Sequence, residues 1–170
     1  MSDLTIRKVL PEHWQVHRAV RFAMLLDQPR AYGSTFAREI AFDDQVWHDR
    51  VREGAAWLAL HGDLPVGTVT LWSVPDRPAD EACLVAMWVA AHARGTGVAD
   101  GLVEALVAHA TGLGLRRVTL DVADENPRAA AFYARVGFVR TGRTGELPHY
   151  PGVGEFEMEH LLRGRTDASR

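Results

Sequence analysis

The 170-residue sequence has very little cysteine and lysine. Cys83 is the only cysteine, so no disulfide can form within the chain, and a reducing compartment is the natural expectation. Lys8 is the only lysine, so the sequence has no G-x-x-x-x-G-K-[ST] motif, which argues against a P-loop NTPase. His13 and His17 lie one helical turn apart, but they do not form an H-E-x-x-H motif and no third metal ligand is evident. We therefore interpret the two histidines as a surface pair.

Several other features are also missing. No uninterrupted apolar run is long enough to span a bilayer. The first residues contain neither the basic nor the apolar region of a secretory signal. The formal charge of -3 gives no broad basic surface for nucleic acid. We therefore expect a cytoplasmic protein that binds neither a membrane nor nucleic acid.

The composition is that of one globular domain. The sequence is 47% hydrophobic and shows no fixed-period repeat or low-complexity linker. We expect one domain over residues 1–162 and a flexible tail over 163–170. Apolar periodicity predicts helices at 12–26, 43–52, 97–111 and 126–136. Strands are expected at 5–8, 56–60, 66–72, 84–89, 118–122, 138–141 and 156–161. This order indicates a mixed α/β sheet.

The most informative segment is a glycine-rich turn, Arg94-Gly95-Thr96-Gly97-Val98-Ala99. It follows the apolar strand at 84–89 and leads into the helix at 97–111. A strand that enters a helix through glycines exposes unpaired N–H groups at the positive end of the helix dipole. The turn is therefore expected to hold a phosphate.

Two motifs in order resemble the GCN5-related N-acetyltransferase (GNAT) family. The run from Val89 to Ala99 resembles the family's V-x-P-x-x-[QR]-x-x-G-x-[GA], with Ala91 where many members have proline. The segment ENPRAAAFYARVGFVRTG resembles the family's Asn-x6-Tyr segment, with Asn126 and Tyr133 at its two key positions. The likeness is close over 84–141 and loose elsewhere.

The resemblance implies a fold and an activity. The fold would be an acyl-CoA N-acyltransferase sheet of about seven strands with four helices, its central strands splayed around a pantetheine arm. The activity would be transfer of the acetyl group of acetyl-CoA to a primary amine by direct attack in a ternary complex, without a metal. The implied cofactor-binding residues are Met87, Trp88, Val89, Arg94, Gly95, Thr96, Gly97, Val98, Ala99, Asp100, Asn126 and Tyr133.

Individual roles follow from the same resemblance. Gly95 and Gly97 would let the backbone approach the pyrophosphate, and the N–H of Val89 would polarise the thioester carbonyl. Asn126 would hydrogen-bond the arm, cap its helix, or do both. Arg94 would add charge to the phosphate site or simply lie in solvent.

Tyr133 is the expected catalytic acid, because a phenol can protonate the departing thiolate. The base is open. Asp121 occupies a position where some members that acetylate protein N-termini carry glutamate. The alternative interpretation of Asp121 is a polar residue without a catalytic role on the exposed face of a strand. Glu39 and Glu81 are further candidates, and His149-Tyr150 could line the acceptor site.

Two other functions are compatible with parts of the sequence. One is a non-catalytic CoA-binding regulator. The other is a small dinucleotide-binding oxidoreductase, since Gly95-x-Gly97 follows a strand and Asp121 ends the next one. Two observations argue against the oxidoreductase. Asp100 occupies the position of the third glycine in the dinucleotide-binding motif, and the chain has no room for a substrate domain. The acceptor stays open among a small amine, an antibiotic, an amino acid and a protein N-terminus, as does a homodimer formed through exposed strand edges.

Overall fold

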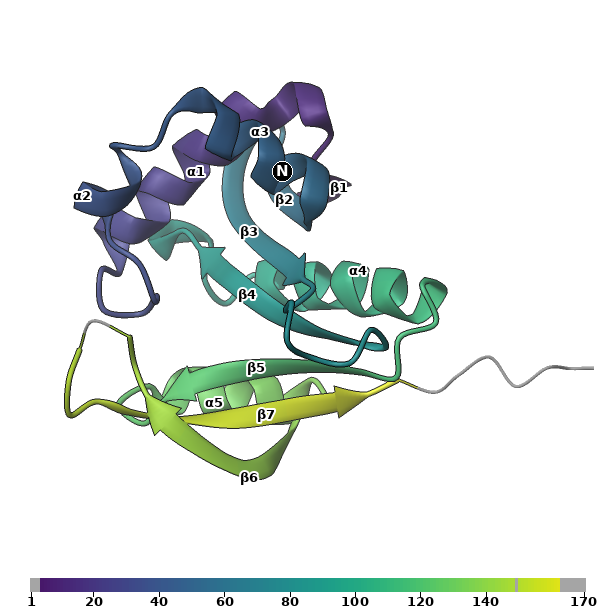
Figure 1. Ribbon diagram of the computed structural model, residues 1–170. Helices are drawn as coiled ribbons and strands as arrows, with labels where there is room; N and C mark the ends of the chain where they lie inside the picture. The colour runs from purple at the N-terminus through teal and green to yellow at the C-terminus, as the bar shows by residue number, and fades with distance from the viewer. Residues whose placement is uncertain (1–3, 149, 163–170) are drawn as a thin grey trace, which may run out of the picture.

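A single seven-stranded sheet runs through the protein (Figure 1). The computed structural model describes residues 4–148 and 150–162. The strand order is β1-β2-β3-β4-β5-β7-β6, and every neighbouring pair is antiparallel except β4 and β5. The strands are β1 Leu4–Lys8, β2 Ala55–His61, β3 Leu64–Trp72, β4 Glu81–Val89, β5 Arg117–Ala123, β6 Val139–Glu146 and β7 Gly154–Leu161. All seven predicted strands are confirmed, and the predicted tail at 163–170 lies outside the described residues.

Five α-helices accompany the sheet in the described part of the chain: α1 Trp14–Asp27, α2 Phe36–Glu39, α3 Asp44–Glu53, α4 Val98–Gly112 and α5 Pro127–Arg135. Four of them were predicted. The fifth, α2, is a single turn, too short to show a period, whose N-cap Thr35 accepts a hydrogen bond from the N–H of Arg38 at 3.2 Å. Among these residues, no helix combines the length and apolar character needed to cross a bilayer.

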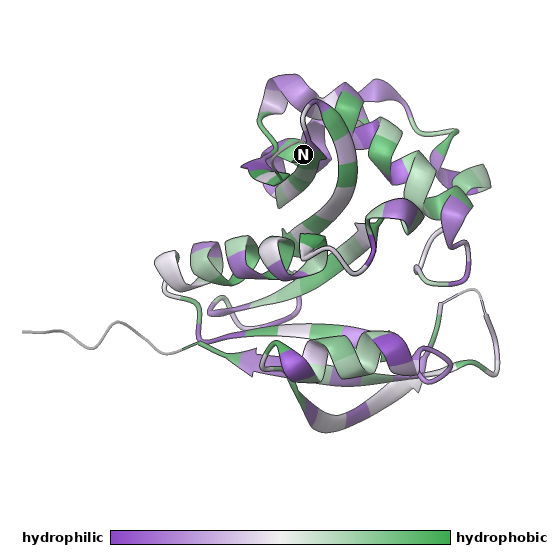
Figure 2. Ribbon diagram, turned by 180° about the vertical axis from the view of Figure 1, so that it is seen from behind, coloured by the Kyte–Doolittle hydropathy of each residue, from purple (hydrophilic) through white to green (hydrophobic). Residues whose placement is uncertain are grey.

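The helices cover both faces of the sheet. Seen from behind, α4 and α5 lie across the same face, while α1, α2 and α3 lie on the other side of the N-terminal half (Figures 1 and 2). Gly67 sets how closely α4 approaches β3, because an added Cβ would meet Val98 Cγ1 at 2.9 Å and the Trp88 carbonyl at 3.0 Å. Val98, Leu102 and Leu106 are fully buried in this contact. The close packing fixes the start of α4, where the glycine-rich turn lies.

The central strands β4 and β5 separate after a short stretch of pairing. They pair in parallel over three positions, from Glu81↔Arg117 to Cys83↔Thr119. Beyond these positions the two strands no longer pair with each other, although β4 continues to Val89 and β5 to Ala123. The strands diverge towards the left of Figure 1. The splay that the family resemblance implies is therefore confirmed.

A β-bulge bends β4 at the point of divergence. Two residues of β4, Ala86 and Met87, lie opposite one residue of β3, Val69, as the register shifts from Thr70↔Val85 to Thr68↔Trp88. Ala86 sits in this bulge with φ of 54°, a conformation uncommon for a residue other than glycine. The bulge turns β4 away from β5 and leaves one side of its backbone unpaired.

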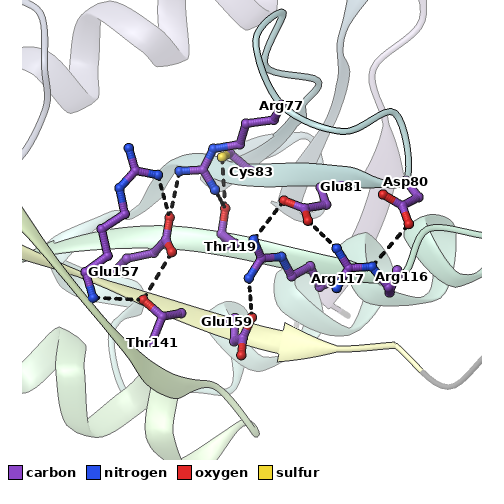
Figure 3. A network of polar contacts seen from close by, with 11 residues as sticks. Arg77, Asp80, Glu81, Cys83, Arg116, Arg117, Thr119, Thr141, Glu157 and Glu159 are labelled. Atoms are coloured by element: carbon purple, nitrogen blue, oxygen red, sulfur yellow. Dashed lines mark hydrogen bonds and ion pairs between the residues drawn. The ribbon is translucent and has the colours of Figure 1, made fainter.

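A network of ion pairs holds the strands together where they still pair (Figure 3). Arg117 donates to Glu81 at 2.9 Å and to Glu159 at 2.6 Å. Arg77, from the β3–β4 loop, donates to Thr119 at 3.0 Å and to Glu157 at 2.6 Å. Glu81 is buried at the paired end of β4, away from the splay, and accepts from Arg116 and Arg117, so the structure gives no support to its role as a base.

Candidate active site

A cleft of about 1580 Å³ lies where β4 and β5 separate. Its lining comes from α1, α2, α3 and the loop between α1 and α2, from β3, β4, β5 and β7, from α5 and the start of α4, and from the β6–β7 loop. Most predicted site residues line it: Glu39, Met87, Trp88, Val89, Arg94, Gly95, Gly97, Ala99, Asp100, Asp121, Asn126 and Tyr133. Two predicted cofactor residues do not. Val98 is buried beneath the turn, and the Thr96 hydroxyl donates to the carbonyl of Ala93 at 2.7 Å.

The glycine-rich turn presents free N–H groups to this cleft. Gly95 and Gly97 have φ of 79° and 87°, in the left-handed region that favours glycine, and a Cβ on either would meet no atom within 4 Å. Gly97 is the N-cap of α4 and has no side chain to accept a bond from the first turn. In the first hydrogen bond of the helix, the N–H of Gly101 donates to the carbonyl of Gly97 at 3.1 Å. The N–H groups of residues 98–100 therefore have no partner within the helix. This geometry suits an anion.

Arg94 fixes the turn to its surroundings. Its Nη2 pairs with Asp27 at 2.6 Å, and its Nε donates to the Val89 carbonyl at 3.0 Å. Asp27 also accepts from Trp88 Nε1 at 2.9 Å. Arg94 is therefore neither free in solvent nor an unpaired charge, and it joins the turn, β4 and the end of α1. Sequence reasoning missed Asp27, because a single aspartate at a helix end carries no pattern.

The unpaired side of β4 faces the cleft. The N–H of Ala90 donates to Val66 on β3 at 2.8 Å, so the preceding N–H, that of Val89, points away from β3. The Tyr32 hydroxyl donates to the Met87 carbonyl at 3.0 Å and ties the α1–α2 loop to the bulged strand. Backbone groups of 87 and 89 are thus turned towards the side that β5 has left.

Asn126 and Tyr133 lie at the two ends of one short helix. The Asn126 side chain accepts from the N–H of Ala129 at 3.1 Å, so the predicted helix cap is confirmed. Tyr133 is 7% exposed, and its ring packs edge-on against Phe132 and Phe138. No hydrogen bond within residues 4–148 and 150–162 uses its hydroxyl. Burial, with a smaller contribution from the charge of Tyr32, raises the pKa of Tyr133, so the phenol stays protonated and able to donate.

The two candidate bases differ sharply. Glu39 is fully buried and accepts from Arg21 at 2.7 and 3.0 Å and from Arg50 at 2.8 Å. Burial alone would raise its pKa, but the two arginines hold it at about 2, so Glu39 is a weak base in a structural ion pair. Asp121 is an exposed residue whose carboxyl lies in the cleft, where partial desolvation and the charge of Glu157 raise its pKa. Of the two, Asp121 has the environment that a base requires.

His17 lines the cleft, which corrects its interpretation as a surface residue. Its Nδ1 is buried without a hydrogen-bond partner, whereas His13 Nδ1 accepts from the N–H of Leu10 at 3.4 Å. Burial, and then the charges of Arg50 and Arg21, lower the pKa of His17 to about 4. The spacing of the two histidines could not reveal this, because the burial of His17 depends on the tertiary packing that brings Arg50 of α3 near it.

This pKa predicts a pH dependence of stability. The unfolded chain binds a proton at His17 below about pH 6.5, but the folded protein does so only near pH 4. Stability is therefore expected to fall as pH falls through this window, by at most roughly 3 kcal/mol. Urea unfolding at pH 7 and pH 4.5 should show a smaller loss for His17→Gln than for the wild type, while the exposed control His92→Gln should lose as much as the wild type. Equal losses in all three proteins would contradict the assignment.

Two loops meet over one end of the cleft. The Tyr150 hydroxyl donates to the Pro29 carbonyl at 2.9 Å, and Arg30 pairs with Glu125 at 3.4 Å. The α1–α2 loop therefore contacts both the β6–β7 loop, through Tyr150, and the β5–α5 loop, through Glu125, and the first two loops face each other on the left of Figure 1. Tyr150 thus bridges the loops, and His149, predicted with it, lies outside the described residues.

Comparison with known proteins agrees with this geometry. Residues 20–138 match the model of the acetyltransferase (GNAT) family. The chain therefore belongs to the GNAT family.

Individual relatives share this class. A probable N-acetyltransferase family 8 member 5 from Mus musculus is 33% identical over 110 residues, which cover 64% of this chain and 48% of that protein. The chain thus spans about half the length of the mouse relative. A 5-NmdU N-acetyltransferase from Pseudomonas phage PaMx11 is 27% identical over 141 residues, covering 83% of this chain and 91% of its own. The crystal structure of a GNAT-family acetyltransferase from Streptococcus pneumoniae has a TM-score of 0.76 at 20% identity, covering 95% of this chain and 100% of that one.

Proposed function

We propose that this protein is an N-acetyltransferase that moves the acetyl group of acetyl-CoA to a primary amine by direct attack in a ternary complex. The observation that carries the proposal is the arrangement of donors around the cleft. The donors are the free N–H groups at the start of α4, which follows β4, and the buried Tyr133 of α5, which follows β5. Both line the same cleft, between the unpaired backbone of β4 and the diverging β5.

The turn is the proposed site for the pyrophosphate of acetyl-CoA. The N–H groups of residues 95–100 would donate to its oxygens at the positive end of α4. The pantetheine amides would pair with backbone groups of 87–89 that face the cleft, as an added strand pairs with a sheet edge. The Met87 and Val89 carbonyls there already accept from Tyr32 and Arg94, and each carbonyl oxygen has a second lone pair for the arm. Asp100, in the first turn, pairs with Arg135 at 2.7 Å, so its charge is neutralised beside the proposed phosphate site.

The chemistry then requires three groups. The amine nitrogen would attack the thioester carbonyl carbon, and the N–H of Val89 would stabilise the negative charge on the carbonyl oxygen. When the intermediate collapses, the carbon–sulfur bond breaks and Tyr133 would give its proton to the departing thiolate. Asp121 would accept the proton lost by the amine, through a water because aspartate is short. No covalent acyl-enzyme is needed.

Release of CoA thiol tests this proposal. The purified protein is incubated with acetyl-CoA and a panel of primary amines, and free thiol is measured with a chromogenic reagent. We expect release that depends on the amine and is matched mole for mole by an N-acetylated product in mass spectrometry. Release without an amine, or no release with any amine in the panel, would count against the proposal.

Gly97→Val is expected to raise the Kd of acetyl-CoA by about 100-fold. A β-branched side chain is strained at a φ of 87°, and it would stand where a phosphate must approach the backbone. Gly112→Val is the matched control, because Gly112 lies at the far end of α4 without a positive φ. Isothermal titration should show near wild-type affinity for the control. Unchanged affinity in Gly97→Val would mean that the phosphates bind elsewhere.

A further inference from the structure

The helical end of the cleft contains an excess positive charge. Glu39 is the single carboxylate between two guanidinium groups, those of Arg21 and Arg50. Its pKa of about 2 keeps it ionised at neutral pH, so the three groups sum to one positive charge. The Arg21 and Arg50 side chains are only 14% and 36% exposed, and both line the cleft. Charge in such a position is costly unless an anion accompanies it.

The neighbouring groups do not remove this charge. His17 is neutral at pH 7, since its pKa is about 4. Arg38 and Glu53 also line this end, but both are exposed and their charges are of opposite sign. Within residues 4–148 and 150–162, Glu39 is the only carboxylate paired with either arginine. The N–H groups of Arg50 other than the Nη1 group bonded to Glu39 make no hydrogen bond in this part of the chain.

Two buried polar atoms at the same end are also without partners. Ser34 is 6% exposed and lines the cleft, and its Oγ makes no hydrogen bond. The hydroxyl lies near enough to Glu39 to help lower the pKa of that carboxyl, but its geometry does not form a bond. The Nδ1 of His17 is likewise unpartnered. Buried polar groups are nearly always hydrogen-bonded, so these two indicate that a polar ligand group completes the site.

We propose that the acceptor amine carries a carboxylate, which binds to Arg50 and Arg21 with a hydrogen bond from Ser34. The inference rests on the proposed acetyl transfer and narrows its acceptor to a small amino-acid-like molecule. A carboxylate fits because its single negative charge balances the single excess positive charge of this end. A phosphate dianion would instead leave one excess negative charge. The planar guanidinium also matches the two oxygens of a carboxylate.

The opposite side of the cleft suits the amine of such a molecule. Asp121 and Glu155 both line the cleft and lie on neighbouring strands, where Ala123 is the partner of Glu155. Neither forms an ion pair within residues 4–148 and 150–162. Partial burial and the charge of Asp121 raise the pKa of Glu155. A cleft with one positive and one negative end fits a zwitterion.

Matched pairs of acceptors test the inference. The standard amino acids, their carboxamides and the corresponding decarboxylated amines are compared by thiol release, which gives kcat/KM for each. We expect at least one amino acid to exceed its carboxamide by about 10- to 100-fold, the loss expected when a charged hydrogen-bond partner is removed. Arg50→Gln should abolish this preference, while Arg52→Gln, an exposed arginine on the same helix, should keep it.

Ser34→Ala is the second variant, because its hydroxyl has no bond within the protein to lose. It should lower kcat/KM for the amino acid and leave that of the carboxamide unchanged, with Ser73→Ala as its exposed control. Carboxamides or plain amines that react as well as the amino acids would overturn the inference while acetyl transfer stands. No turnover of any amino acid, by a protein that binds acetyl-CoA, would also overturn it. Failure to bind acetyl-CoA would instead remove the proposed function itself.

Discussion

Replacing Tyr133 with phenylalanine is expected to lower kcat for acetyl transfer by about 10²- to 10⁴-fold, the range typical of a lost general acid. The departing thiolate would have to leave without a proton donor. The Kd of acetyl-CoA should stay nearly unchanged, because phenylalanine keeps the ring that packs against Phe132 and Phe138. Stopped-flow or steady-state thiol release gives kcat, and calorimetry gives Kd.

The matched control for this change is Tyr150→Phe. It removes the same hydroxyl from a residue that bridges the two loops and does not line the cleft, so we expect a much smaller loss of kcat. Wild-type turnover in Tyr133→Phe would eliminate Tyr133 as the acid. A loss confined to the affinity for acetyl-CoA would assign it to binding instead.

Glu39→Ala is expected to lower the free energy of unfolding by about 3–5 kcal/mol, the usual cost of removing one partner from a buried ion pair. The variant would leave Arg21 and Arg50 side by side with no carboxylate between them. Urea unfolding followed by fluorescence measures the change. Asp49→Ala is the control, because its exposed pair with Arg52 should contribute about 1 kcal/mol or less.

The same experiment separates the two roles considered for Glu39. A structural ion pair predicts lost stability, whereas a catalytic base predicts a stable protein with low kcat. A Glu39→Ala variant that unfolds at the wild-type urea concentration would contradict the structural role that the contacts with Arg21 and Arg50 indicate.

The parts of the candidate site that consist of contiguous residues could be predicted from the sequence. The turn at 94–99 needs only a strand, two glycines and a helix, all contiguous in the chain, and the structure gives both glycines positive φ. Asn126 and Tyr133 belong to one helix, so their spacing is also a local property. The order of helices and strands along the chain likewise follows the alternation of apolar segments, but the place of β7 between β5 and β6 in the sheet was not predicted.

The parts that could not be predicted depend on contacts between distant residues. Asp27 reaches Arg94, Tyr32 reaches Met87, and Arg77 reaches Glu157. Each pair joins segments whose proximity exists only once the sheet has formed. The bulge at Ala86 is hidden for a related reason, because it lies in an apolar run without glycine or proline to mark it. The burial of His17 and the pairing of Glu39 followed from the same tertiary packing.

The most direct test of the proposed function is a calorimetric titration of the purified protein with acetyl-CoA, beside parallel titrations with NADH and NADPH. The arrangement of the turn, the unpaired strand β4 and Tyr133 predicts micromolar binding of one acetyl-CoA per chain and no binding of either nicotinamide cofactor. Absence of acetyl-CoA binding would contradict the enzymatic proposal while leaving the fold and family in place. Binding of NADH or NADPH in its stead would favour the oxidoreductase alternative.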